Sequence, residues 1–201
     1  RASAGRLGAT DVDLTEVARA AIADTVALAA ERGIELALEC GPSVCALSGT
    51  VQQPAAGDPT SGAVPDSALH PDQHEPLMAT SSDPQSLAVL VRNLVDNAVR
   101  YGHRDGRVIV RVERVERSGV RLTVDDDGPG IPDDEHERVF DRFYRRNPGE
   151  TTGSGLGLAI VRAIADRHHA QIALDRSPLG GLRVSVRFPG GDEAPTAMRA
   201  A

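Results

Sequence analysis

Val-Arg-Leu-Thr-Val-Asp-Asp-Asp-Gly-Pro-Gly-Ile, residues 120–131, joins an alternating strand to a turn rich in acid and glycine. The alternation of apolar and polar residues over 120–124 is typical of a half-buried strand. Asp126 then begins an Asp-x-Gly-x-Gly pattern, in which the glycines permit a tight turn and a close approach to a ligand. A carboxylate accepts hydrogen bonds and donates none, so Asp126 suits an exocyclic amino group such as that of adenine. A plain acidic loop and calcium chelation are the alternatives, but the further ligands of a helix-loop-helix calcium site are missing.

The segments around this turn predict an α+β fold. Residues 108–116 alternate like 120–124 and are separated from them by Ser118-Gly119, which predicts a hairpin. Apolar spacing predicts three helices, over 13–32, 84–101 and 155–168. Further strands are predicted at 34–40, near Leu77, at 171–176 and at 182–188, the last two joined by a Gly180-Gly181 turn. We expect one sheet with the helices on one of its faces.

The helix expected over 84–101 carries two asparagines. Asp83 is placed to cap it and Pro84 to open it. Its apolar face consists of Leu87, Leu90, Val91, Leu94, Val95 and Ala98. Asn93 and Asn97 are four residues apart at the border of this face, although asparagine has low helix propensity. They either offer neutral amide oxygens to a hard cation or are solvated polar residues.

Two further segments suggest contacts with phosphate. Residues 139–146 place aromatic side chains among charged ones, which favours a loop that packs reversibly and presents Arg142 and Arg145 to phosphate oxygens. An ordinary surface helix is the alternative. Residues 153–157, Gly-Ser-Gly-Leu-Gly, run into a helix, and backbone N–H groups at a helix N-terminus bind anions. This run is not a phosphate-binding loop of the Walker type, because no Lys-Ser/Thr follows it.

Composition limits the remaining possibilities. The chain has 201 residues, 22 basic and 29 acidic, and its formal charge of −7 argues against a general nucleic-acid binder. No apolar run is long enough to span a bilayer, and Cys40 and Cys45 do not form a disulfide framework, which favours a cytoplasmic setting. Residues 41–75 contain five prolines and four glycines, so we expect a flexible insertion there and a disordered tail over 190–201. The start at Arg1, without a methionine, suggests a fragment of a longer protein.

Together, the asparagine pair, the Asp126 turn, the aromatic segment and the second glycine run resemble the catalytic and ATP-binding domain of bacterial sensor histidine kinases. That domain shares its superfamily with gyrase, Hsp90 and MutL. The resemblance covers residues 12–40 and 76–189. It implies a two-layer α/β sandwich with a mixed, mostly antiparallel sheet, of the Bergerat type, over 13–189. Residues 132–152 would form the ATP lid, and 1–12 would be the end of a dimerisation helix or a linker.

The resemblance also assigns roles, with ATP and Mg²⁺ as cofactors. Asn97, with Asn93 beside it, would hold Mg²⁺ on the triphosphate. Arg100 would reach the terminal phosphates, and Arg142 or Arg145 would lie near the γ-phosphate. The remaining positions would hold the nucleotide: Tyr101 near the base, Asp126 on the adenine amino group, Gly128, Gly130 and Ile131 around that pocket, and Gly153, Gly155, Leu156 and Gly157 on the phosphates.

The implied reaction transfers the γ-phosphoryl group of ATP to a histidine. The six histidines of the chain lack the context of the family's acceptor box, so the acceptor would belong to a dimerisation domain absent from this chain. The implied partners are that domain and a response regulator, with no nucleic acid. This fragment would make no membrane contact, and it would lie on the cytoplasmic side of a membrane-anchored protein. The alternatives are a serine kinase or ATPase of the same superfamily, and a nucleotide-binding module without catalysis.

Overall fold

The computed structural model describes residues 10–40, 78–115, 119–144 and 155–189. Its main sheet has five strands: β2 (Glu35–Cys40), β4 (Arg107–Val115), β5 (Gly119–Asp125), β7 (Leu182–Phe188) and β6 (Gln171–Arg176), in that spatial order. β2 pairs with β4 in parallel, and the other three pairings are antiparallel. The predicted hairpin and the predicted mixed, mostly antiparallel sheet are therefore confirmed.

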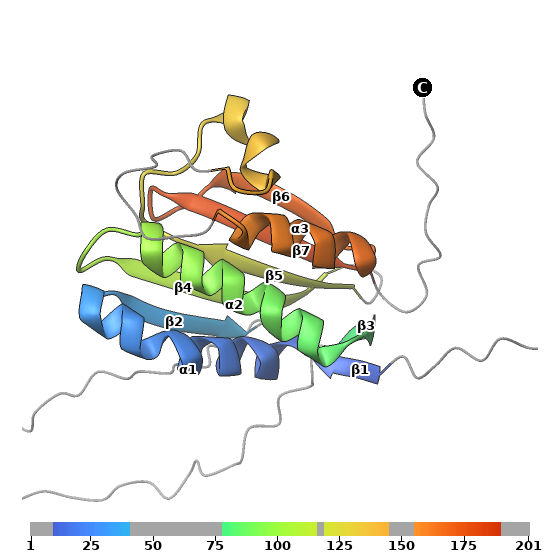
Figure 1. The fold of residues 1–201 in the computed structure, drawn as a ribbon. Helices are drawn as coiled ribbons and strands as arrows, with labels where there is room; N and C mark the ends of the chain where they lie inside the picture. Colours follow the sequence, from blue (N-terminus) through green and yellow to red (C-terminus); the bar gives the residue numbers. More distant parts are fainter. Residues whose placement is uncertain (1–9, 41–77, 116–118, 145–154, 190–201) are drawn as a thin grey trace, which may run out of the picture.

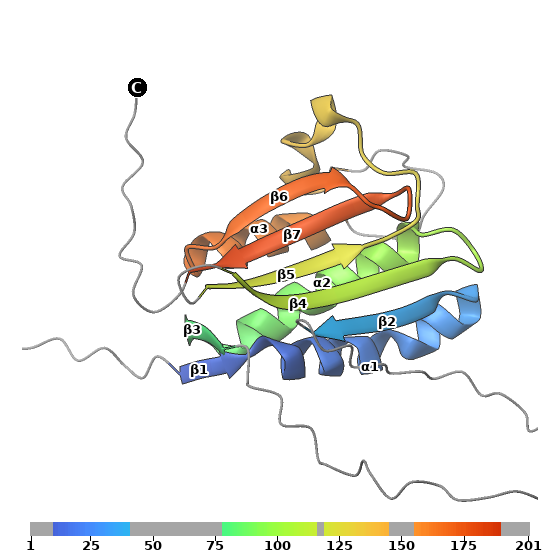
Figure 2. The same cartoon turned by 180° about the vertical axis from the view of Figure 1, so that it is seen from behind.

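Three helices cover one face of this sheet (Figure 1). They are α1 (Leu14–Arg32), α2 (Pro84–Tyr101) and α3 (Gly157–Arg167). α2 lies between the other two and contacts both. Figure 2 shows the opposite face of the sheet, which none of the described helices covers. The fold is thus the expected two-layer sandwich with its helices on one face.

The core lies between the two layers and is aliphatic. Every residue predicted for the apolar face of α2 is buried. These side chains face the apolar core positions of β4, β5 and β7, which recur at every second residue because successive side chains of a strand point to opposite faces. The sheet's share of the core includes Val108, Val110, Val112, Val120, Leu122, Val124, Val184, Val186 and Phe188.

The helix ends follow their local sequence. The Asp13 carboxylate accepts a 2.8 Å hydrogen bond from the Thr15 backbone N–H, and the Asp83 carboxylate accepts one from Gln85 N–H. Pro84 opens α2, where its missing N–H removes no helical bond. Gly33 ends α1 in the left-handed region at φ 69°, which glycine adopts without steric penalty. The Asp83 cap and the start of α2 at Pro84 were predicted from the sequence.

One short sheet was not predicted. Thr10–Asp13 forms strand β1, which pairs antiparallel with β3 (Met78–Ser82). Residues 10–12 are therefore extended and not helical, and the expectation that residues 1–12 are the end of a dimerisation helix or a linker stays a prediction, because residues 1–9 lie outside the described part of the chain. The predicted insertion 41–75 and tail 190–201 lie outside the described residues, as do Cys45, Arg145 and Gly153. Among the described helices, none combines the length and the apolar character that crossing a membrane requires.

Candidate functional site

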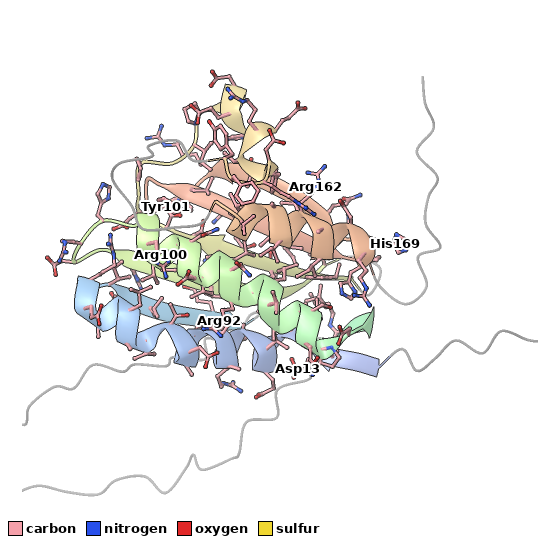
Figure 3. All side chains as sticks on the ribbon, in the orientation of Figure 1. Asp13, Arg92, Arg100, Tyr101, Arg162 and His169 are labelled. Carbon is pink, nitrogen blue, oxygen red and sulfur yellow. The ribbon has the colours of Figure 1, made fainter. Side chains whose placement is uncertain are left out.

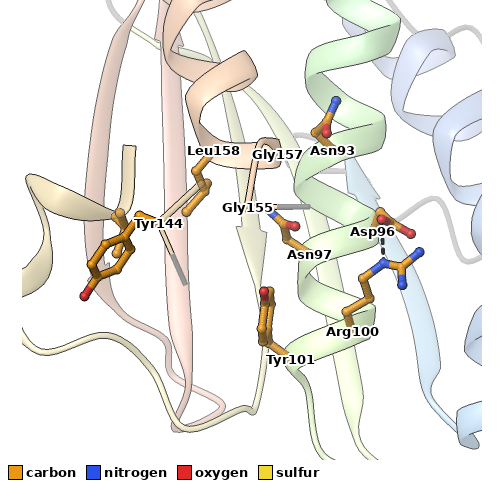
Figure 4. A pocket seen from close by; sticks show the side chains of 10 residues that line it. Asn93, Asp96, Asn97, Arg100, Tyr101, Tyr144, Gly155, Gly157 and Leu158 are labelled. Carbon is orange, nitrogen blue, oxygen red and sulfur yellow. Dashed lines mark hydrogen bonds and ion pairs between the residues drawn. The ribbon is translucent and has the colours of Figure 1, made fainter. Parts of the chain in front are cut away.

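A cavity of about 540 Å³ opens between α2, the N-terminus of α3 and the segment that precedes α3 (Figure 4). One wall comes entirely from α2, and the other comes from residues 139–144 and 155–158. The cavity lies where the predicted asparagine pair meets the second glycine run, so both segments border the same cavity. It is lined by Asn93, Asp96, Asn97, Arg100, Tyr101, Val139, Tyr144, Gly155, Gly157 and Leu158.

The α2 wall is polar because five of its residues recur at helical spacing on one side. Asn93 and Asn97 stack one turn apart, as predicted. The Asn93 side-chain NH₂ donates a 2.7 Å hydrogen bond to the Val89 carbonyl, which turns its Oδ1 away from its own helix turn. Figure 3 shows Arg100 and Tyr101 at the C-terminal end of the same helix. The wall therefore offers amide oxygens at one end and a cation and an aromatic ring at the other.

The N-terminus of α3 faces the asparagine pair. A Cβ atom on Gly157 would lie 3.0 Å from both amide atoms of Asn97 and 3.4 Å from Asn93 Oδ1. In contrast to α1 and α2, no N–H group in the first turn of α3 donates a hydrogen bond to the side chain of the N-cap residue, which is Leu156. Its N–H groups and the positive end of the helix dipole are consequently available to an anion.

An ion pair lies in the α2 wall. Arg100 Nε donates to Asp96 Oδ2 at 2.7 Å, one helical turn away. This hydrogen bond raises the pKa of Arg100, so the guanidinium remains charged. Asp96 was not among the predicted site residues. It could have been found because an acid four residues before an arginine on a helix commonly forms such a pair.

The three consecutive carboxylates after β5 have three different environments. Asp125 is buried and points to the uncovered face of the sheet, where Arg183 donates to it from Nε at 2.7 Å and from NH2 at 2.9 Å. Asp127 accepts the His103 N–H and the Arg107 N–H, both at 3.1 Å, and so fixes the loop between α2 and β4. The repulsion among the three carboxylates is reduced because Asp125 and Asp127 each accept hydrogen bonds from different donors.

Asp126 is buried, and its Oδ1 accepts the Gly128 N–H at 2.9 Å and the Leu182 N–H at 3.0 Å. Within the described part of the chain no donor is bonded to its Oδ2. In the described part of the chain, Arg32 Nε is the single side-chain N or O atom that is fully buried without a hydrogen-bond partner. Asp126 Oδ2 has no partner either, so it is not fully buried and keeps some access to solvent. Burial raises the pKa of Asp126, against the two backbone hydrogen bonds that lower it. The unpaired oxygen can accept one further hydrogen bond.

The Asp126 turn adjoins the Tyr101 end of the cavity. A Cβ atom on Gly128 would lie 2.4 Å from the Tyr101 carbonyl oxygen, so only a glycine permits this contact. Gly130 adopts φ 67°, which also favours glycine. Asp126, Gly128, Gly130 and Ile131 are not themselves in the lining of the cavity. The structure thus places the predicted acid turn against the end of the cavity and not inside it.

The segment before α3 folds into two short 3-10 turns, η1 (Asp133–Glu135) and η2 (Arg138–Phe140). The Tyr144 hydroxyl donates to Glu135 at 3.0 Å, and Arg138 lies over the Tyr144 ring. Phe143 adopts φ 66° and is 71% exposed. The predicted lid is described as far as Tyr144.

Six of the fourteen predicted site residues line this cavity. Asn93, Asn97, Arg100, Tyr101, Gly155 and Gly157 line it, and Leu156 caps α3 beside it. Arg142 is exposed and does not line it. The lining also includes Val139, Tyr144 and Leu158, which the sequence analysis did not select as site residues. Hydrophobic or aromatic character alone gave no signal for their position.

The sequence of this chain is similar to that of known proteins. The family model for histidine kinase-, DNA gyrase B- and HSP90-like ATPases matches residues 82–192, just over half of the chain. The sensor-type histidine kinase PrrB of Mycobacterium tuberculosis is 42% identical over 108 residues, 53% of this chain and 24% of PrrB. The sensor histidine kinase CpxA of Escherichia coli K12 is 39% identical over 110 residues, 53% of this chain and 23% of CpxA. The chain therefore spans about a quarter of the length of these relatives.

Solved structures agree over a longer stretch. The mycobacterial sensor histidine kinase MprB superposes with a TM-score of 0.66 at 26% identity, covering 91% of this chain and 98% of that one. The ATP-binding domain of PrrB from Mycobacterium tuberculosis gives a TM-score of 0.59 at 26% identity, covering 90% and 97%. The described fold is that of sensor histidine kinase catalytic domains. The chain belongs to the histidine kinase-, DNA gyrase B- and HSP90-like ATPase family.

Proposed function

We propose that this chain is the ATP-binding catalytic domain of a sensor histidine kinase, which transfers the γ-phosphoryl group of Mg-ATP to a histidine of a separate dimerisation domain. One observation carries the proposal. The uncapped N-terminus of α3 faces the Asn93–Asn97 pair across an open cavity, with Arg100 in the same wall. This combination suits a triphosphate with a bound cation.

The residues present fit magnesium. Asn97 and Asn93 bring neutral amide oxygens to the cavity, and oxygen is the ligand type that Mg²⁺ prefers. The described residues contain no group of three His, Cys, Asp or Glu side chains that could hold a metal by themselves. Mg²⁺ commonly relies on substrate phosphates and water for most of its ligands. When bound, the ion would neutralise phosphate charge, with Asn97 as its principal protein ligand and Asn93 beside it.

The remaining residues would position the nucleotide. The backbone of Gly155, Leu156 and Gly157, with Gly153 ahead of them, would donate to phosphate oxygens, and Arg100 would reach the terminal phosphates. Tyr101 would lie beside the base, with Gly128, Gly130 and Ile131 around it. Asp126 Oδ2 would accept a hydrogen bond from the adenine 6-amino group, since Oδ1 already accepts two hydrogen bonds. Arg142 or Arg145 would approach the γ-phosphate through movement of the lid.

Transfer then depends on positioning and on charge neutralisation. A histidine nitrogen would attack the γ-phosphorus in line with the leaving oxygen, a P–N bond would form, and the bond to the β-phosphate oxygen would break to release ADP. Arg100 and the α3 N-terminus would stabilise the negative charge that develops on the leaving phosphates. The acceptor domain, a response regulator as the next phosphoryl acceptor and a membrane-anchored parent protein with this domain on the cytoplasmic side are parts of the same proposal.

The test is phosphorylation with γ-labelled ATP. The chain alone should bind Mg-ATP and incorporate negligible label, and addition of its own dimerisation domain should yield label on that domain. The label should be lost in acid, as phosphohistidine is, and should disappear in an Asn97→Ala variant. Acid-stable label would instead identify a serine kinase of the same superfamily, and binding without transfer would identify a nucleotide-binding module.

A further inference from the structure

Gly181, the residue before β7, lies directly against the Asp126 turn although the two are far apart in sequence. A Cβ atom on Gly181 would lie 2.2 Å from Asp126 Oδ1, 2.4 Å from the Gly128 nitrogen and 2.6 Å from the Asp126 carbonyl oxygen. Two of these three atoms belong to the backbone and cannot move aside independently. The third is the carboxylate itself, so any side chain at position 181 must displace Asp126.

Hydrogen bonds also hold Asp126 against Gly181 and Leu182. Asp126 N–H donates to the Leu182 carbonyl at 3.0 Å, and Gly181 N–H donates to the Asp126 carbonyl at 3.2 Å. Leu182 N–H donates to Asp126 Oδ1 at 3.0 Å. These bonds extend the pairing of β5 with β7 past its last regular pair, Asp125 with Arg183. The start of β7 therefore fixes both the main chain and the carboxylate of Asp126.

We propose that Gly181 is a positioning residue that determines base specificity, through the orientation of Asp126. The inference rests on the proposed function, in which Asp126 accepts the adenine amino group. The N–H groups of Gly128 and Leu182 donate hydrogen bonds to Asp126 Oδ1, which leaves Oδ2 to accept one from the base. Without a side chain at 181 the carboxylate keeps this orientation. With one, the carboxylate rotates, loses its backbone donors and no longer presents Oδ2 to the amino group.

The neighbouring glycine separates this effect from turn formation. Gly180 adopts φ 104°, a conformation that favours glycine, and a Cβ atom there would meet nothing within 4 Å. Gly181 has no such positive φ, so its own φ angle does not require glycine. Gly180 is thus needed for the turn, and Gly181 for the space beside Asp126.

The experiment measures the affinity of wild type and Gly181→Ala for Mg-ATP and for the triphosphate of purine riboside, which lacks the 6-amino group. Wild type should bind ATP at least about tenfold more tightly than the analogue, because the analogue lacks one charge-assisted hydrogen bond. In Gly181→Ala this ratio should fall to about one, while affinity for the analogue changes little. A purely structural defect would weaken both ligands equally and leave the ratio unchanged, which would overturn the inference.

Two further variants complete the test. Pro178→Ala, in the same β6–β7 connection and exposed, should keep the wild-type ratio. If Gly181→Ala does not fold, Leu182→Pro removes the N–H that donates to Asp126 Oδ1, at the first residue of a strand where proline is tolerated, and should also lower the ratio. A wild-type ratio in Leu182→Pro would then overturn the inference. A ratio of one in wild type would overturn base recognition by Asp126 and this inference with it, and Mg-ATP binding in the same titration would leave the proposed ATP-binding domain standing.

Discussion

Gly157 combines two opposing demands at a single position. It is the first residue of α3, where alanine would favour the helix, and a Cβ atom there would lie within 3.0 Å of Asn97. The sequence indicated a glycine run at a helix start, but it could not show that this glycine faces an asparagine from another helix. The residue therefore leaves room for Asn97 at the expense of helix stability.

Gly157→Ala should lower the affinity for Mg-ATP about tenfold, equivalent to about 1.4 kcal/mol, because Asn97 must shift away from the cavity. The free energy of unfolding should not fall, because replacing glycine in a compatible conformation gains about 0.4–1 kcal/mol. Calorimetric titration and urea unfolding measure the two quantities. Ala163→Ser, at an exposed position of the same helix, is the control and should bind ATP normally. Unchanged ATP affinity in Gly157→Ala would contradict this account.

Asp126→Asn should alter the pH dependence of stability. Burial raises the pKa of Asp126 in the folded state, so the folded protein binds more protons than the unfolded chain just above the ordinary pKa of 3.8. The contribution of this group to stability therefore falls as pH rises through that interval. Relative to wild type, the variant should gain stability between pH 4 and pH 7 in urea unfolding. A relative loss over the same range would show that the carboxylate is stabilising.

The elements show which parts of the fold local sequence determines. α2 begins and ends where it was predicted, because Asp83 and Pro84 define its start and its apolar face is regular. α3 begins two residues later than predicted, because Gly155 adopts φ 67°, outside the helical region. β1 was missed because its extended conformation depends on pairing with β3, which is distant in the sequence. Gly181 was read as a turn residue, because its contact with Asp126 exists only in the folded chain.

α2 and α3 are joined at the ends remote from the cavity. The Ser86 hydroxyl lies 2.8 Å from His168 Nε2, which connects the start of α2 to the end of α3. Burial lowers the pKa of His168, Arg167 and His169 lower it further, and Asp83 opposes them. The folded state therefore favours the neutral imidazole and links the two helices that carry the site.

His168→Gln should reduce the acid sensitivity of the fold. Because the folded pKa lies below the ordinary value of 6.5, the unfolded chain binds the proton more readily, and stability falls as pH drops below 6.5. Thermal unfolding at pH 7.5 and pH 5 should show a smaller loss in the variant than in wild type. His103→Gln, on an exposed loop, is the matched control and should lose as much as wild type. An equal loss in His168→Gln and wild type would contradict the assignment.

Across the whole molecule, the uncovered face of the sheet carries a line of charges from β2 to β7. Arg111 donates to Glu39 at 2.6 Å and lies 3.5 Å from Asp125, which Arg183 contacts in turn. The hydrogen bond to Asp125 raises the pKa of Arg183. This line joins four strands immediately behind the Asp126 turn. The sequence placed three acids together there, but cross-strand pairing decided which of them faces which way.

Arg183→Leu should destabilise the fold by about 3 kcal/mol, the lower end expected for breaking a buried pair, because it leaves Asp125 buried with one distant partner. Arg92→Leu breaks the exposed 3.7 Å pair with Asp24 and should change stability by less than about 1 kcal/mol. Urea unfolding at pH 7 measures both. Similar effects of the two substitutions would show that the line of charges contributes little.

The central claim is that α2, the N-terminus of α3 and the Asp126 turn surround one purine triphosphate. A crystal structure with Mg²⁺ and a non-hydrolysable ATP analogue tests it most directly. We predict phosphates against the α3 N-terminus, the metal beside Asn97 and the adenine amino group within hydrogen-bond distance of Asp126. A nucleotide bound outside this cavity, or bound with its base at the α3 N-terminus, would contradict the claim.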